Sequence, residues 1–411
     1  MSEPLSARER TRGRRLAITS HPFGMTYWMA FTQHMPTLAL VTLGASEAIV
    51  GLQNSFLPAL QALQLPTLRA VGRVSKRRIL VLGQIVAVLG GIPMLFFATL
   101  ASWEGNAKVT IALLSLAVVA AGLQTSNTVW FPLLRGFVEP RRIGTFFGML
   151  RTGWHLALIL YYVAAQRWLV FHPGSFAPLF AVAWGCGLLR IFLIAALPER
   201  SERTGERIRV REAFALLRQP LLRRYLIGVS WCAALRMSVV PFAIVMMRRE
   251  VGFSEADVIV TTVAFFAGGF VSLYLWGRVV DRIGPAPVFL TTTLGMAALL
   301  VGLLFLREPG AQGLAFGTVF FFGYSLLSAG FGVADTHVLF GLAPPEAPAR
   351  TLVVAGVLTN TVAGLAPIAV GLTLDRALAV AESPLAVYHA FFAFAAVAQA
   401  LVFLPLRIFR R

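Results

Sequence analysis

Residues 329–336 read Ala-Gly-Phe-Gly-Val-Ala-Asp-Thr and lie inside a long apolar run over about 314–342. They include Asp335, the only acidic residue well inside any apolar segment of the chain. Shifted back by 208 positions, residues 121–128 read Ala-Gly-Leu-Gln-Thr-Ser-Asn-Thr, so Ala, Gly and Thr recur in register and Asn127 takes the place of Asp335.

A second pair of segments has the same offset. Residues 44–48 read Gly-Ala-Ser-Glu-Ala, and residues 252–256 read Gly-Phe-Ser-Glu-Ala. Two matches at one offset predict that one structural unit is written twice along the chain. The acid of the long apolar run then belongs to the second copy only.

The composition predicts a membrane protein. Hydrophobic residues make up 57% of the 411 positions and charged residues 13%, whereas soluble domains carry roughly 25% charged residues. This length holds about a dozen membrane helices of ~20 residues with short loops. Backbone groups in lipid must be satisfied internally, so spans are helices or a closed barrel, and continuous apolar runs favour helices over alternating strands. We therefore expect an all-α integral membrane protein with twelve transmembrane helices.

The net charge of +18 is distributed as membrane topology requires. With the N-terminus placed in the cytoplasm, 27 of the 36 Lys and Arg residues fall in cytoplasmic segments, which is the positive-inside pattern. The sequence predicts a multi-pass protein of a bacterial-type inner (plasma) membrane, with both termini cytoplasmic and no nucleic-acid partner. Cys186 and Cys232 lie in apolar segments and form no metal-ligand spacing, so we expect no metal and no cofactor.

Changes in composition divide the chain into two halves. A polar segment with eight arginines separates them. We expect a disordered cytoplasmic tail (1–21), an N-terminal six-helix bundle (22–197), an Arg-rich cytoplasmic linker (198–224), a C-terminal six-helix bundle (225–406) and a short tail (407–411).

A loop motif adds a family resemblance. Residues 277–284 read Gly-Arg-Val-Val-Asp-Arg-Ile-Gly, which resembles the Gly-x-x-x-Asp-Arg-x-Gly signature of the major facilitator superfamily. The matching positions are Gly277, Asp281, Arg282 and Gly284. In the corresponding first-half loop Arg73 fits, but Gly72 replaces the aspartate and Ser75 the second glycine.

The resemblance implies two six-helix bundles around a central cavity that work by alternating access. Spans 1, 4, 7 and 10 would line the cavity, and the signature loop would act as a charge latch on the cytoplasmic side. The missing first-half aspartate puts that latch in doubt there, while Asp281 and Arg282 could still form one. The sequence has no phosphate-cradling Gly-Lys-Ser/Thr loop, so we expect no direct drive by ATP.

Two charged residues inside spans are the sharpest candidates for transport chemistry. A buried carboxylate such as Asp335 is costly in a membrane and suggests an ion or substrate pathway, although it could instead make a helix-packing hydrogen bond, as its twin Asn127 could. Arg236 lies near the middle of span 7 and requires a carboxylate, carbonyl groups or an anionic ligand. Asp335 is its most obvious protein partner.

Other polar residues have both a functional and a packing interpretation. Tyr27, Gln33 and His34 form a polar stripe in the first span (22–43), where His34 could relay protons or simply pack. Gln124, Asn127 and Trp130 share a face of span 4 and could bind an amphiphilic ligand or hold helices together. Arg151 either snorkels to the interface or lines the seam between the halves, and Arg190 is expected to snorkel.

The sequence favours a secondary active transporter of a small solute, not an enzyme, acting as a monomer in the bilayer. His34, Asn127, Arg236 and Asp335 would contribute to its central site. The intramembrane arginine and aspartate favour an anionic or zwitterionic solute, with protons as a candidate coupling ion. Two alternatives remain: a non-transporting membrane assembly factor or sensor on the same scaffold, and a lipid or amphiphile flippase.

Overall fold

The computed structural model describes residues 5–71, 74–134, 136–138, 143–199, 219–342 and 348–409. Within those ranges the chain is helical and contains no strand. It forms two compact units: unit 1 is Met1–Ala45 with Leu60–Arg207, and unit 2 is Ser46–Ala59 with Ile208–Arg411. The all-α expectation is therefore confirmed, and unit 2 includes a short segment from the first half of the sequence.

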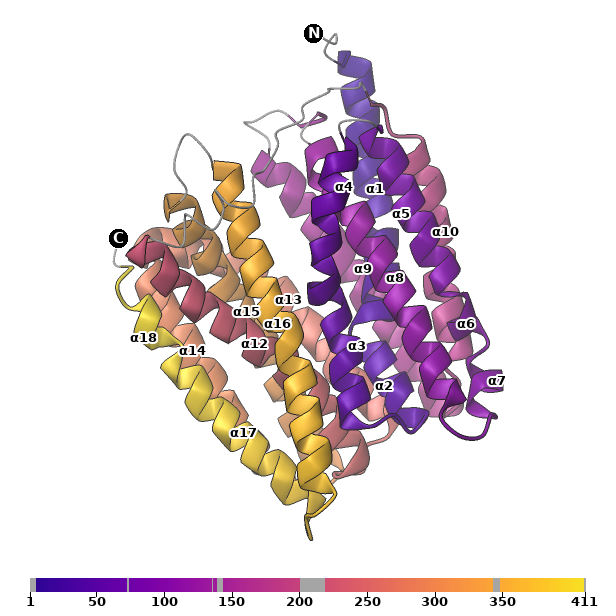
Figure 1. The fold of residues 1–411 in the computed structure, drawn as a ribbon, viewed down its shortest axis with the longest axis vertical. Coiled ribbons are helices and arrows are strands. Elements are labelled where there is room, and N and C mark those ends of the chain that lie inside the picture. Colours follow the sequence, from indigo (N-terminus) through magenta and orange to yellow (C-terminus); the bar gives the residue numbers. More distant parts are fainter. Residues whose placement is uncertain are drawn as a thin grey trace. The chain divides into compact units, whose positions relative to one another are not determined.

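Unit 1 is a bundle of long helices interrupted by short ones (Figure 1). Its helices α5 and α8 pack along each other, and α1 packs against α9 and α10. The helices are α1 (Ala7–Thr32), α2 (His34–Thr42), the 3₁₀ turn η1 (Gln61–Leu63), α4 (Gln64–Val71), α5 (Lys76–Gly90), α6 (Ile92–Leu95), α7 (Phe97–Ala101), α8 (Ala107–Leu134), α9 (Ile143–Phe171) and α10 (Ala177–Ala195).

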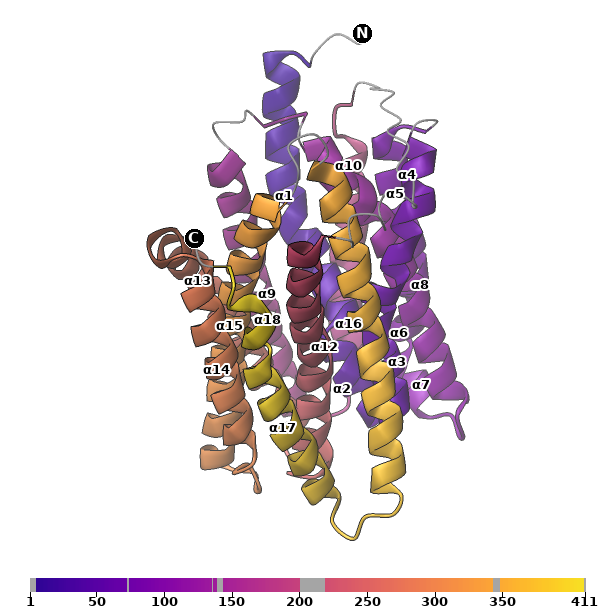
Figure 2. The ribbon, with the colours of Figure 1, turned by 60° about the vertical axis from the view of Figure 1, so that its left-hand side comes forward.

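Unit 2 is built mainly from second-half helices, of which α12, α16 and α17 are seen lengthwise in Figure 2. Helix α15 packs against α13 and α14, and α12 packs against α16. The helices are α3 (Glu47–Leu60), α12 (Pro220–Arg249), α13 (Glu255–Ile283), α14 (Pro285–Leu303), α15 (Ala311–Leu342), α16 (Pro348–Leu378), α17 (Pro384–Leu401) and α18 (Phe403–Leu406).

The sequence repeat corresponds to a repeated turn and helix start. Gly44 and Gly252 both have positive φ angles, 87° and 84°, a conformation that glycine adopts without a steric penalty. Helix α3 then begins at Glu47 and α13 at the equivalent Glu255. The shared residues are explained by the same chain reversal, which precedes a helix in each half.

The structure corrects one expectation about the first segment of the chain and adds a break to another. Residues 1–21 were expected to be disordered, but α1 already begins at Ala7, where Ser6 and Glu9 form a capping box that satisfies two backbone donors reciprocally. The span expected over 22–43 is also divided at Gln33. Pro36 accounts for this break, because it cannot donate to the carbonyl four residues earlier and its ring crowds that carbonyl.

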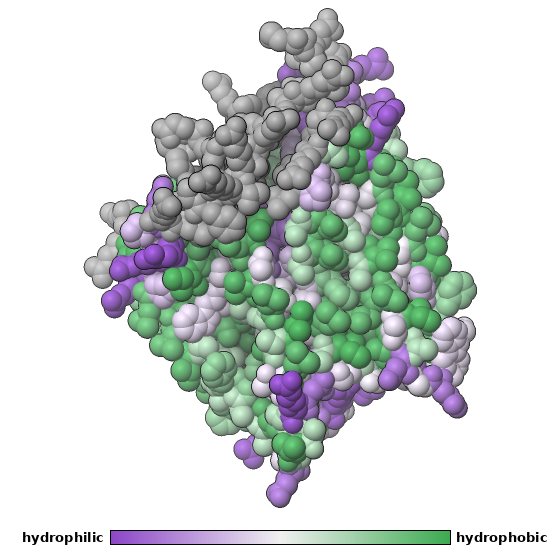
Figure 3. Space-filling model, viewed as in Figure 1, coloured by the Kyte–Doolittle hydropathy of each residue, from purple (hydrophilic) through white to green (hydrophobic). Residues whose placement is uncertain are grey.

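The surface agrees with a membrane location. On the face shown in Figure 3, hydrophobic side chains cover most of the helix sides, and hydrophilic ones gather toward the helix ends. Among the described residues, eight helices are long and apolar enough to cross a membrane. The full count of twelve spans stays a prediction.

Candidate functional site

In unit 2, the predicted intramembrane acid is held by a tyrosine. Asp335 on α15 is half-buried, and its Oδ1 accepts a hydrogen bond from the hydroxyl of Tyr225 on α12. The Tyr225 ring is buried and meets Phe409 edge-on, with 6.0 Å between ring centroids. A neutral donor stabilises the carboxylate without cancelling its charge, so this group remains able to bind a proton or a cationic group.

Arg236 is the other charged candidate of unit 2. Its side chain on α12 is exposed, and within the described ranges no ion pair joins it to Asp335. Of the kinds of partner expected for Arg236, the Asp335 carboxylate is bonded to Tyr225, and an anionic ligand stays a prediction. An exposed guanidinium far from either end of its helix is available to an anionic group.

A second charged cluster in unit 2 surrounds the start of α3. The Glu47 side chain is 8% exposed and accepts hydrogen bonds from Arg249 Nη1 and from the Tyr388 hydroxyl, the latter at 2.8 Å. Asp375 accepts from the backbone N–H groups of Glu47 and Ala48, at 2.9 and 3.1 Å. This carboxylate caps the first turn of α3, where the helix dipole also favours a negative charge.

Backbone contact between α3 and α16 accompanies this cluster. A Cβ added to Gly51 would lie 2.1 Å from the Pro367 carbonyl oxygen, and one added to Gly371 would lie 2.4 Å from the Glu47 carbonyl oxygen. Small residues permit such close approach in membrane bundles. We call these contacts, with the Glu47 cluster, the α3–α16 seam.

The repeat places a second acid in an equivalent position. Glu255, the twin of Glu47, is 5% exposed and lies 3.6 Å from Arg248 Nη2. The glutamates that begin α3 and α13 therefore meet consecutive arginines at the end of α12. The sequence marked Glu47 only as part of a repeated segment, so its participation in an ion pair was missed.

In unit 1, two of the predicted polar residues are hydrogen-bonded to neighbouring helices. The Tyr27 hydroxyl donates to the Ala87 carbonyl at 2.6 Å, and Gln64 Nε2 donates to Gln124 Oε1 at 3.1 Å. Asn127 is half-buried. His34 is 3% exposed and opens α2 directly after the break at Gln33, and irregular backbone of this kind at membrane depth occurs where it is buried in protein or lines a cavity.

Arg190 is buried, which contradicts the expected snorkelling. Its side chain on α10 is 5% exposed and lies over the Trp130 ring at 5.2 Å from the ring centroid. The His21 ring stacks on the same indole at 5.8 Å. Among the described residues no ion pair to Arg190 is found and its Nε has no hydrogen-bond partner, so the cation–π contact with Trp130 helps to stabilise this buried charge. Gly24 leaves the space that the guanidinium fills, because a Cβ there would lie 1.9 Å from Nη1.

The remaining predicted residues lie at the surface or outside the described ranges. Arg151 is exposed. In the signature loop, Gly277, Asp281 and Arg282 are exposed, no ion pair of Asp281 or Arg282 is found in the part of the chain that the structure describes, and Gly284 has φ +81° between α13 and α14. Arg73 lies outside the described residues.

Comparison with solved structures identifies the fold. The nucleoside transporter NupG superposes with a TM-score of 0.71 at 14% identity, covering 98% of this chain and 99% of that chain. A POT family transporter in complex with 5-aminolevulinic acid gives 0.71 at 12% identity, covering 97% and 96%. The human organic anion transporter MFSD10 gives 0.64 at 14% identity, covering 97% and 99%. No family model and no curated protein sequence matches the chain.

The chain has the major facilitator fold. The resemblance drawn from the 277–284 motif is thus confirmed at the level of fold. Together with its apolar helices, this fold makes the chain a multi-pass membrane protein.

Proposed function

We propose that this chain is a secondary transporter that moves a small solute by alternating access. The observation that carries the proposal is the Asp335–Tyr225 pair, a carboxylate half-buried among apolar helices with a neutral partner. A carboxylate placed inside a membrane costs free energy, and transporters use such groups as ion or substrate sites. A fold shared with transporters over nearly its full length supports the same reading.

The substrate class we propose is anionic or zwitterionic. The exposed guanidinium of Arg236 supplies a positive group, and Asp335 supplies a negative one on a helix of the same unit. The similar structures include POT family transporters in complex with 5-aminolevulinic acid and with a thioalcohol-conjugated peptide, and the human organic anion transporter MFSD10. Protons are the proposed coupling ion, because Asp335 can exchange a proton without breaking an ion pair.

The α3–α16 seam suggests how the cycle would be gated. Helix α3 comes from the first half of the sequence, while Arg249, Asp375 and Tyr388 come from the second. In this proposal α3 moves relative to the other helices of unit 2 during alternating access, so the contacts along the seam break and re-form. We propose that the Glu47 cluster closes one end of the pathway and opens once per cycle.

The proposal is tested with purified protein in neutral detergent and then in proteoliposomes. Thermal-shift screening against anionic, zwitterionic and neutral metabolites at two pH values should give hits of one charge class, because a ligand that binds only the folded state raises Tm. Uptake of those hits should depend on an inward proton gradient. Asp335→Asn should remove the proton dependence and reduce uptake at least tenfold.

Two variants separate chemistry from structure in this test. Tyr225→Phe keeps the Asp335 charge but removes its donor, and it should shift the pH profile of uptake while retaining proton dependence. Glu382→Gln removes an exposed acid that belongs to none of the proposed sites and should leave uptake and its proton dependence unchanged. If no solute is taken up by wild type, or if Asp335→Asn leaves uptake and its pH profile intact, the proposal fails and the assembly-factor alternative gains support.

A further inference from the structure

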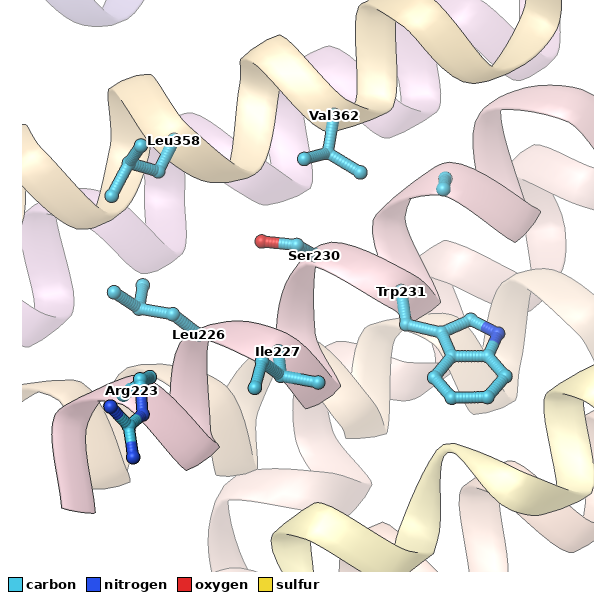
Figure 4. A pocket seen from close by; sticks show the side chains of 8 residues that line it. Arg223, Leu226, Ile227, Ser230, Trp231, Leu358 and Val362 are labelled. Carbon is cyan, nitrogen blue, oxygen red and sulfur yellow. The ribbon is translucent and has the colours of Figure 1, made fainter. Parts of the chain in front are cut away.

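A groove in unit 2 lies outside the sites described so far. It has a volume of about 520 Å³ and runs between α12 and α16. Leu226, Ile227 and Trp231 line it from α12, while Leu358 and Val362 line it from α16 (Figure 4). The side chains of Ile227, Trp231 and Val362 are exposed, so the groove is apolar and open along the side of the helices.

Among the described residues, no polar side chain on the floor of the groove lacks a hydrogen-bond partner. Ser230 is the one hydroxyl that lines it, and its Oγ donates to Thr359 Oγ1 at 3.3 Å. The hydroxyl groups of Ser230 and Thr359 thus bond to each other between α12 and α16. Such a floor favours a hydrocarbon chain over a polar solute.

One end of the groove carries a positive charge. Arg223 lines this end and is exposed, and it lies in the first turn of α12, which begins at Pro220. The N-terminus of a helix adds a partial positive charge. The charge of Arg223 and the helix N-terminus both favour an anion at this end of the groove. The apolar side chains continue away from it along one face of α12.

The length of the groove matches one leaflet. From Arg223 to Ala234 the helix rises about 16 Å at 1.5 Å per residue. The hydrocarbon core of one leaflet is about 15 Å thick. A lipid with its phosphate at Arg223 would therefore extend its acyl chain along the groove to about the middle of the bilayer.

We propose that this groove is a binding site for an anionic phospholipid, with the phosphate on Arg223 and one acyl chain between α12 and α16. Basic pockets between transmembrane helices bind anionic headgroups in this way. None of the residues that line the groove is a proposed transport residue, and the proposal does not depend on the identity of the substrate. Occupation by lipid would cover the exposed apolar face between the two helices.

Native mass spectrometry of the delipidated full-length protein tests the site. Phosphatidylglycerol and phosphatidylcholine with identical acyl chains serve as probes. We expect phosphatidylglycerol to bind several-fold more tightly, and Arg223→Gln to weaken its binding about fivefold, since one cationic side chain near the headgroup contributes about 1 kcal/mol. Phosphatidylcholine binding should change less than twofold.

Two further variants complete the design. Arg224→Gln removes the same charge from the next position of α12, which does not line the groove, and should weaken phosphatidylglycerol binding less than twofold. Val362→Trp places an indole in the groove and should weaken both lipids. Thermal unfolding of each variant confirms that it is folded. Any one of three outcomes would overturn the proposal. The wild type could bind both lipids equally, or Arg223→Gln and Arg224→Gln could weaken phosphatidylglycerol binding equally. The third is a Val362→Trp variant that binds both lipids as tightly as the wild type.

Discussion

Replacing Gly371 by alanine should open the α3–α16 seam. The added Cβ would lie 2.4 Å from the Glu47 carbonyl oxygen, and a backbone oxygen inside a helix cannot rotate away. The helices must then separate, which pulls the first turn of α3 away from the Asp375 carboxylate that caps it. We expect a cost of about 3 kcal/mol, the upper range for overpacking, which shifts an equilibrium between closed and open seams more than a hundredfold.

The experiment uses a protein in which Cys186 and Cys232 are replaced by serine and Ala48→Cys supplies a single cysteine. The measurement is the rate at which a membrane-impermeant thiol reagent labels that cysteine. Gly371→Ala should raise this rate and lower Tm. Glu47→Gln should act in the same direction, because it leaves Arg249 without its carboxylate partner. Gly302→Ala is the matched control, since nothing lies within 4 Å of its added Cβ. Equal labelling in Gly371→Ala and the control would rule out a tight seam.

Replacing Gly24 by alanine should destabilise unit 1, and the loss should depend on Arg190. The added Cβ would lie 1.9 Å from Arg190 Nη1 and 2.4 Å from its Cζ. The guanidinium could move only by giving up its contact with the Trp130 ring, because the side chain is buried. We expect about 2–3 kcal/mol of destabilisation, seen as a clear fall in the thermal unfolding midpoint in detergent.

A double-mutant cycle isolates this contact. In an Arg190→Ala background, Gly24→Ala should lower the free energy of unfolding only slightly. The coupling free energy between the two substitutions should therefore be more than about 1.5 kcal/mol. Gly185→Ala on α10, with open space around its Cβ, should be neutral or slightly stabilising. Arg190→Met should unfold at or above the wild-type temperature, since it removes a buried charge that lacks an ionic partner. Additive effects of the Gly24 and Arg190 substitutions would contradict the packing described here.

The fold was predictable because its signals are local or periodic. Apolar runs indicated helices, and the repeated Gly and Ser-Glu positions marked equivalent turns at Gly44 and Gly252. The motif around Asp281 pointed to the correct fold. The break at Gln33 also has a local cause in Pro36, although a single apolar span was expected there.

The candidate site was less predictable because side-chain partners depend on packing. Asp335 was recognised by its charge, yet Tyr225 rather than Arg236 reaches it. Arg190 lies close enough to a helix end to suggest snorkelling, but Gly24 and Trp130 provide a buried position for it. No spacing rule predicts either arrangement.

The Glu47 cluster was missed for a similar reason. Its partners Arg249 and Tyr388 are 202 and 341 positions away, so no local pattern links them. One sequence signal was present: Arg248 and Arg249 are adjacent at the end of α12, an end that the predicted topology places outside, where the positive-inside pattern leaves few arginines. A basic pair on that side is a reason to look for acidic partners.

Because α3 comes from the first half of the sequence, unit 2 is completed late during synthesis. Helix α3 leaves the ribosome 328 residues before Asp375, which caps it. At 5–20 residues per second, this interval is about 15–65 seconds. Arg249 follows Glu47 by 202 residues and Tyr388 by 341, so for roughly the first 10–40 seconds of that interval the Glu47 carboxylate at the first turn of α3 has neither partner. A nascent chain stalled before residue 249 should therefore remain sensitive to proteolysis at α3, and release of the stall should protect it.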